Sequence, residues 1–136
     1  MGEKKAIELF KSGYNCAQAV FMAFADELGL DVETAAKLSC GLGGGVGRSR
    51  EVCGAVTGAT LVIGMRHGSD KDIVYPEVQK FIEAFKKETS SIVCRELLEG
   101  TGASAGGMAE KRTPEYYKKR PCVELVALAA RILENA

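Results

Sequence analysis

The chain has 136 residues, a length that suits one domain with a buried core. Apolar residues make up 46% and charged residues 26%, which is typical of globular proteins and argues against disorder. Lysine plus arginine equals aspartate plus glutamate at 18 each. This balance disfavours a nucleic-acid-binding protein, and it also disfavours electrostatic docking to an anionic membrane surface.

The N-terminal half shows apolar residues at helical spacing, and no stretch of the chain alternates with period two for long. This pattern predicts helices over residues 3–10, 15–28 and 32–39. Asn15 and Asp31 stand at the starts of the second and third helices, where they suit N-caps. The glycine-rich segment 41–48 follows, and it should form neither a stable helix nor a strand.

The C-terminal half begins with a helix expected over residues 50–67, which should be buried because it is apolar nearly all round. Three further helices are expected: one starting near Pro76, one from Ser90 or Ser91 to Leu98, and one from Pro121 to Leu133. The fold class is therefore predicted as all-α, with residues 1–136 forming a single-domain bundle of five to seven helices around a buried central helix. The apolar last helix could also serve a homodimer interface.

The five cysteines are the unusual feature of this composition. The N-terminus shows no signal-peptide pattern, and the longest apolar run, Val52 to Met65, is too short for a comfortable membrane span. We therefore expect a cytoplasmic protein, in a compartment where structural disulfides are rare. Because no CxxC pair is present, the fold itself must assemble any site that several cysteines share.

Four cysteines fall at predicted helix starts, namely Cys16, Cys53, Cys94 and Cys122, whereas Cys40 lies at a predicted helix end. Unpaired N–H groups and the helix dipole favour an anion at a helix N-terminus, and such positions can lower the pKa of a thiol. The thiolate is both the nucleophile and the metal ligand. The pattern therefore favours one site built from these four thiols, although buried cysteines can also simply pack.

Three segments of the chain also carry a family resemblance: residues 14–20 (YNCAQAV), 41–48 and 51–59 (EVCGAVTGA). They resemble the redox-active four-cysteine family, whose signature is a cysteine, a CGAxxG element and two further separated cysteines. The resemblance covers nearly the whole chain and places the family's cysteines on Cys16, Cys53, Cys94 and Cys122, with Cys40 outside the pattern. It implies a small prokaryotic protein, and it implies no established substrate or reaction.

Three functions remain open at this point. In the first, the four cysteines bind a metal, either zinc or an iron–sulfur cluster that transfers electrons. In the second, the protein carries out metal-free thiol–disulfide chemistry with a redox partner protein or a small thiol. Cys53 is then the candidate attacking thiol, with Arg48 and Arg50 stabilising its thiolate. In the third, the chain is a non-enzymatic helical interaction module whose cysteines pack.

The glycine-rich segment offers a candidate cofactor- or anion-binding site at Gly44, Gly45 and Arg48, because backbone N–H groups before a helix can cradle an anion. It is not a Walker A loop, since no Lys-Ser/Thr pair follows its last glycine. We favour close backbone approach beside Cys53 as its role. The charged stretches 110–112 and 118–120 are interpreted as solvated faces.

Overall fold

The computed structural model covers residues 1–136 and describes every side chain except those of Lys118 and Lys119. The described residues form helices joined by irregular segments, together with one isolated antiparallel bridge between Val52 and Val93. The elements are α1 (Gly2–Lys11), α2 (Cys16–Ala23), α3 (Ala25–Leu28), α4 (Val32–Ser39), the 3-10 turn η1 (Cys40–Leu42), α5 (Gly43–Val46), α6 (Gly54–His67), α7 (Lys71–Thr89), α8 (Cys94–Leu97), α9 (Pro114–Lys119) and α10 (Cys122–Glu134). The predicted all-α class is confirmed.

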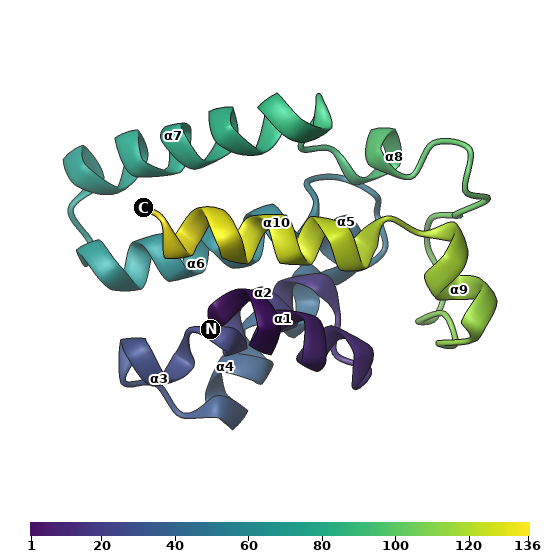
Figure 1. Cartoon of the computed structure of the whole chain (residues 1–136), viewed down its shortest axis with the longest axis horizontal. Helices are drawn as coiled ribbons and strands as arrows, with labels where there is room; N and C mark the ends of the chain where they lie inside the picture. Colours follow the sequence, from purple (N-terminus) through teal and green to yellow (C-terminus); the bar gives the residue numbers. More distant parts are fainter.

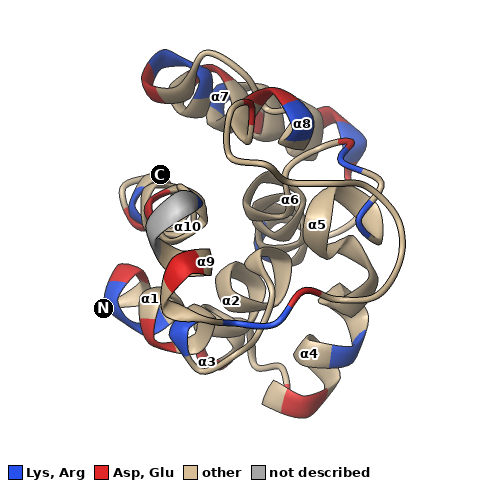
Figure 2. Ribbon diagram, turned by 90° about the vertical axis from the view of Figure 1, so that its right-hand side faces the viewer, with Lys and Arg blue, Asp and Glu red and all other residues tan. Residues whose placement is uncertain are grey.

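Helix α6 is the centre of the bundle, as its composition predicts. It packs against α2, α7 and α10, and its buried side chains include Val56, Val62 and Ile63. Figures 1 and 2 show α7 on one side of α6 and α10, and α1 to α4 on the other. The apolar face of α10 is used within the chain, where it packs against α1, α2, α6 and α7. No described helix combines the length and the apolar character that crossing a membrane requires.

The N-terminal helices begin where the sequence predicts. Asn15 accepts at Oδ1 from the Gln18 backbone N–H over 2.9 Å, and Gln18 Oε1 accepts from the Asn15 N–H over 3.0 Å. This reciprocal capping box fixes the start of α2. The helix predicted over 15–28 is interrupted at Phe24, whose ψ of 7° separates α2 from α3. Asp31 caps α4 as expected, with its carboxylate accepting from the Thr34 N–H.

Three predicted helix starts in the C-terminal half are wrong. Helix α6 begins at Gly54 rather than Arg50, because residues 50–53 form backbone hydrogen bonds with residues 92–95 instead. Helix α7 begins at Lys71 because the Asp70 carboxylate caps it, so Pro76 lies inside the helix. Helix α8 begins only at Cys94, since Ser90 adopts a left-handed conformation that ends α7.

Candidate functional site

Four cysteines from four helix N-termini line one small cavity of ≈ 50 Å³. Cys16, Cys94 and Cys122 are the first residues of α2, α8 and α10, and Cys53 is the N-cap of α6. Cys53, Cys94 and Cys122 are only 3%, 7% and 6% exposed, and Cys16 is half-buried. The structure therefore brings together the four thiols that the sequence singles out.

Backbone pairing between two distant segments holds Cys53 beside Cys94. The Cys53 N–H donates to the Ile92 carbonyl over 2.7 Å, and the Cys94 N–H donates to the Glu51 carbonyl over 2.6 Å. These bonds flank the isolated Val52–Val93 bridge. A short two-stranded contact thus positions both thiols. The sequence gives no sign of this contact, because neither segment shows an alternating apolar pattern.

The glycine-rich segment allows the backbone to approach Cys94 closely, whereas the expected close approach was to Cys53. A β-carbon at Gly45 would lie 2.7 Å from Cys94 Cβ and 2.6 Å from the Glu51 nitrogen. Gly44 and Gly45 line the thiol cavity, and both adopt positive φ angles of 67° and 69°. Their candidate role in binding a cofactor or an anion remains a prediction.

Arg50 is the guanidinium that contacts a cysteine directly. Its Nη1 donates to Cys94 Sγ over 3.7 Å, its Nε donates to the Ser104 carbonyl over 2.9 Å, and the residue is 8% exposed. Arg48 makes other contacts, donating to the carbonyls of Met108 and Ser104. The expectation that Arg48 stabilises a Cys53 thiolate therefore finds no support in these contacts.

Arg112 and Arg120, expected on solvated faces, instead lie against aromatic rings beside the thiols. The Arg112 guanidinium carbon lies 4.3 Å from the Phe10 ring centroid and 5.0 Å from that of Tyr116. Arg120 is 8% exposed and also lies 5.0 Å from the Tyr116 centroid. Lys118 and Lys119 were also expected on a solvated face, but their side chains lie outside the described ones. Sequence reasoning missed both arginines because short charged runs usually face water.

The thiols differ sharply in acidity. The pKa of Cys122 is lowered to about 7, first by hydrogen bonding with the Cys16 side chain and then by the charges of Arg120, Arg112 and Arg50. The same hydrogen bonding, followed by burial, raises the pKa of Cys16 well above its usual range. The directions of these two shifts favour ionisation of Cys122 over ionisation of Cys16.

The pKa of Cys53 is raised, whereas a lowered pKa was predicted for it. Burial raises the pKa of Cys53 to about 12, and backbone hydrogen bonds from Ala55 and Val56 only partly oppose that effect. Burial also raises the pKa of Cys94, although Arg50 opposes the shift. This raised pKa does not support Cys53 as a low-pKa attacking thiol, because desolvation outweighs the helix N-terminus, and the identity of the attacking thiol stays a prediction.

Tyr116 forms part of the wall between the thiols and the surface. It lines the thiol cavity, and burial followed by the charge on Cys122 raises the pKa of its phenol to about 12. The tyrosine is therefore a neutral hydrogen-bonding group at physiological pH. Cys40, by contrast, is exposed, and its carbonyl accepts from Asn15 Nδ2 over 2.9 Å. It stays outside the four-cysteine cluster, as expected.

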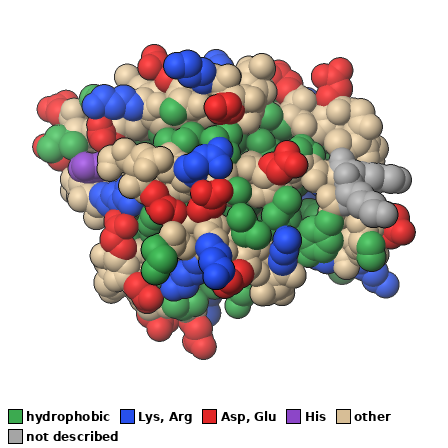
Figure 3. Space-filling model, viewed as in Figure 1, with side chains coloured by type: hydrophobic (Ala, Val, Ile, Leu, Met, Phe, Trp, Pro, Cys, Tyr) green, Lys and Arg blue, Asp and Glu red, His purple; other side chains and the backbone are tan. Residues whose placement is uncertain are grey.

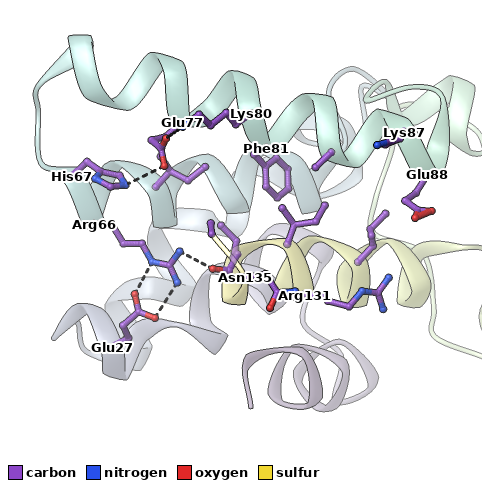
Figure 4. A pocket seen from close by; sticks show the side chains of 16 residues that line it. Glu27, Arg66, His67, Glu77, Lys80, Phe81, Lys87, Glu88, Arg131 and Asn135 are labelled. Carbon is purple, nitrogen blue, oxygen red and sulfur yellow. Dashed lines mark hydrogen bonds and ion pairs between the residues drawn. The ribbon is translucent and has the colours of Figure 1, made fainter.

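A larger cavity of ≈ 880 Å³ lies between α6, α7 and α10. Figure 3 shows hydrophobic side chains gathered between α7 and α10, and Figure 4 shows the polar residues around them. Arg66 forms an ion pair with Glu27 at 2.6 Å, and His67 lies 3.9 Å from Glu77. No cysteine is among the described residues that line this groove, so it is separate from the thiol site.

The comparisons with known proteins agree with the four-cysteine pattern. Residues 14–136 match the family described as "Putative redox-active protein (C_GCAxxG_C_C)". In this chain the central element is Cys53-Gly54-Ala55-Val56-Thr57-Gly58. The cysteine therefore precedes the first glycine, whereas in the family label the cysteine follows it.

An uncharacterised protein of Archaeoglobus fulgidus is 24% identical over 136 residues, which covers 96% of this chain and 89% of the relative. No solved structure matches the chain. The family match extends over nearly the whole chain, from the segment before Cys16 to the last residue. The chain therefore belongs to the redox-active four-cysteine family.

Proposed function

We propose that this protein carries out thiol–disulfide exchange, with Cys122 as the attacking thiolate and Cys16 as the resolving thiol. The observation that carries the proposal is the shared cavity, which is lined by these two thiols together with Arg50 and Arg112, while the charge of Arg120 acts on Cys122 from outside it. Guanidinium groups beside a thiol favour its ionised form, which is the nucleophile. Burial raises the pKa values of Cys53 and Cys94 and leaves those two thiols protonated at neutral pH, whereas the pKa of Cys16 is raised first by its hydrogen bond with Cys122, which is lost once Cys122 has reacted.

The exchange proceeds in two steps. The Cys122 thiolate attacks one sulfur of a disulfide R–S–S–R, which forms a mixed disulfide on Cys122 and releases one thiolate. The Cys16 thiol then loses its proton to solvent and attacks Cys122 Sγ, which releases the second thiolate. Two protein thiols are thereby oxidised to a disulfide, and the substrate disulfide is reduced to two thiols. An external dithiol, such as that of a redox partner protein, would reverse the reaction on the protein.

A bound metal is the competing reading, because thiolates suit zinc and iron–sulfur clusters. Among the residues whose side chains are described, no three or more histidines, cysteines, aspartates or glutamates are grouped so that they could hold a metal ion. This placement of the donors favours exchange chemistry over metal binding. We also predict that the redox partner is a small thiol or a protein, and that the protein works in the reducing cytoplasm.

The test combines a neutral disulfide with a trapping variant. Anaerobically purified protein is treated with bis(hydroxyethyl) disulfide, and its disulfides are mapped by mass spectrometry. We expect a Cys16–Cys122 disulfide in the natural chain and a stable mixed disulfide on Cys122 in Cys16→Ser. Cys40→Ser, which changes an exposed thiol outside the four-cysteine cluster, should still form the Cys16–Cys122 disulfide.

Two results would contradict the proposal. One is a disulfide map in which Cys122 stays reduced while other thiols react. The other is iron, sulfide or zinc in stoichiometric amounts in the anaerobic protein, with the four cysteines resistant to alkylation until the metal is removed. Elemental analysis of the same sample therefore decides between exchange chemistry and metal binding.

A further inference from the structure

A second cavity adjoins the thiol cavity, and we name it the arginine vestibule. Its volume is ≈ 310 Å³, and it is lined by four arginines, Arg48, Arg50, Arg112 and Arg120. Arg50, Arg112 and Tyr116 also line the thiol cavity, so the two spaces share a wall. The vestibule is therefore the larger space directly next to the reactive sulfurs.

The vestibule is strongly positive. Among the described side chains that line it, Glu110 is the only carboxylate, which leaves a formal excess of three positive charges. Glu110 lies 2.6 Å from Arg120 and 3.8 Å from Arg48. The other described hydrogen-bond partners of Arg48 and Arg50 are backbone carbonyls, a hydroxyl and a thiol, which do not cancel the charge. The chain as a whole has no net charge, so this excess is local.

The two cavities differ in what they can admit. The thiol cavity, at ≈ 50 Å³, has room for only about one or two water molecules, whereas the vestibule can hold a small organic molecule. A substrate could place one sulfur atom among the cysteines while its remaining atoms stay in the vestibule. Those remaining atoms would meet guanidinium groups, which pair best with carboxylates and phosphates.

Resting on the thiol–disulfide function above, we propose that the arginine vestibule binds small disulfides that carry carboxylate groups and directs one sulfur toward Cys122. The carboxylates pair with the vestibule arginines, and the disulfide bond faces the thiol cavity. The exchange then follows the two steps given above, with two carboxylate-bearing thiols as products. The vestibule thereby selects substrates by charge, and the cysteines carry out the reaction.

The test compares three symmetric disulfides of similar size: dithiodipropionate, which is anionic, bis(hydroxyethyl) disulfide, which is neutral, and cystamine, which is cationic. Each rate is divided by the rate of the same disulfide with a small free thiol, which removes differences in intrinsic reactivity. At low salt we expect the normalised rate of the anionic disulfide to exceed that of the neutral one about tenfold or more. This advantage should fall as salt is added, because exposed charges are screened.

Two charge variants and a control sharpen the comparison. Glu110→Gln removes the vestibule carboxylate, so the ratio of anionic to neutral rates should rise several-fold. Arg48→Gln should lower that ratio. Arg131→Gln removes a positive charge from an exposed side chain that lines the separate groove between α6, α7 and α10, so the ratio should stay unchanged. Circular dichroism melting curves establish that each variant is folded.

A non-reactive ligand separates this inference from the proposed function. Suberate has the chain length of dithiodipropionate with methylenes in place of sulfurs, so it can bind but cannot exchange. We expect suberate to raise the melting temperature and to slow alkylation of Cys122 by neutral iodoacetamide. If suberate binds but no disulfide reacts, the proposal that the vestibule binds carboxylates stands and the exchange function is overturned. If all three disulfides react at equal normalised rates and suberate has no effect, the proposal that the vestibule binds carboxylates is overturned and the exchange function stands.

Discussion

Gly58 of α6 lies so close to Ala17 of α2 that a β-carbon at position 58 would stand 2.7 Å from the Ala17 carbonyl oxygen. Gly54, one turn earlier, faces Cys16 in the same way, with 3.1 Å between its added β-carbon and Cys16 Cβ. Two glycines one turn apart thus let α2 and α6 pack with their backbones nearly in contact. This contact places Cys16, the first residue of α2, beside the start of α6.

Replacing Gly58 with alanine should therefore destabilise the fold by about 1–3 kcal/mol, because the new methyl group would force the two helices apart. Gly64→Ala is the matched control on the same helix, where an added β-carbon meets nothing within 4 Å. That change should be neutral or stabilising by up to about 1 kcal/mol, since alanine favours helix. Urea unfolding measures both values, and equal effects at the two positions would refute the close-packing argument.

A second glycine comparison tests the loop beside Cys94. Gly45 and Gly47 both have positive φ angles, of 69° and 57°, but only at Gly45 would a β-carbon meet atoms within 3 Å. Gly47→Ala should cost about 1 kcal/mol for the backbone strain alone. Gly45→Ala should cost about 3 kcal/mol or more, because the backbone at Glu51 cannot move without breaking the contact with Cys94. Equal losses of stability would show that the crowding at Gly45 is unimportant.

Cys122 should be the thiol that alkylates first as the pH rises. Its pKa of about 7 predicts that its reaction with iodoacetamide reaches half of its maximal rate near that pH. Cys53 should react much more slowly than Cys122, because the two thiols are similarly buried but the pKa of Cys53 is raised to about 12. Brief alkylation pulses from about pH 5 to about pH 10, followed by peptide mapping, provide the measurement, and exposed Cys40 shows that the reagent is active. Faster reaction at Cys53 than at Cys122 would reverse the assignment.

The buried Cys53 also predicts a loss of stability in alkaline solution. Above about pH 9 the unfolded chain loses the Cys53 proton, whereas the folded chain keeps it until the pH approaches about 12. The free energy of unfolding should therefore fall with rising pH in this window, by up to about 1.4 kcal/mol per pH unit for this one proton. Below about pH 9 the thiol is protonated in both states and contributes no slope.

Cys53→Ala isolates this contribution. Urea unfolding under reducing conditions, at several pH values above about 9, should show a shallower decline for Cys53→Ala than for the natural chain. Cys40→Ala, which changes the exposed thiol, should keep the original slope. The lowered pKa of Cys122 affects the natural chain and Cys53→Ala alike, so it does not account for a difference between their slopes. Parallel curves for Cys53→Ala and the natural chain would contradict the prediction.

Local signals in the sequence were reliable where neighbouring residues decide the outcome. Asn15 and Asp31 cap their helices as predicted, because a capping side chain needs only the N–H groups two or three residues ahead. The signals failed at Arg50, Pro76 and Ser90, where competing contacts moved the helix starts. At Arg50 the competing contact comes from residues 92–95, which lie far away along the chain.

Local patterns in the amino-acid sequence are enough to establish that the chain is helical, that four cysteines occupy helix N-termini and that the family is the redox-active one. The differences in acidity among the four thiols, by contrast, depend on tertiary packing. Desolvation of Cys53, and the gathering of Arg50, Arg112 and Arg120 around Cys122, depend on segments that meet only when the bundle is packed. A helix N-terminus acts on its own first turn and is the same local feature at all four cysteines, whereas burial and charge pairing differ at each and therefore set the acidity.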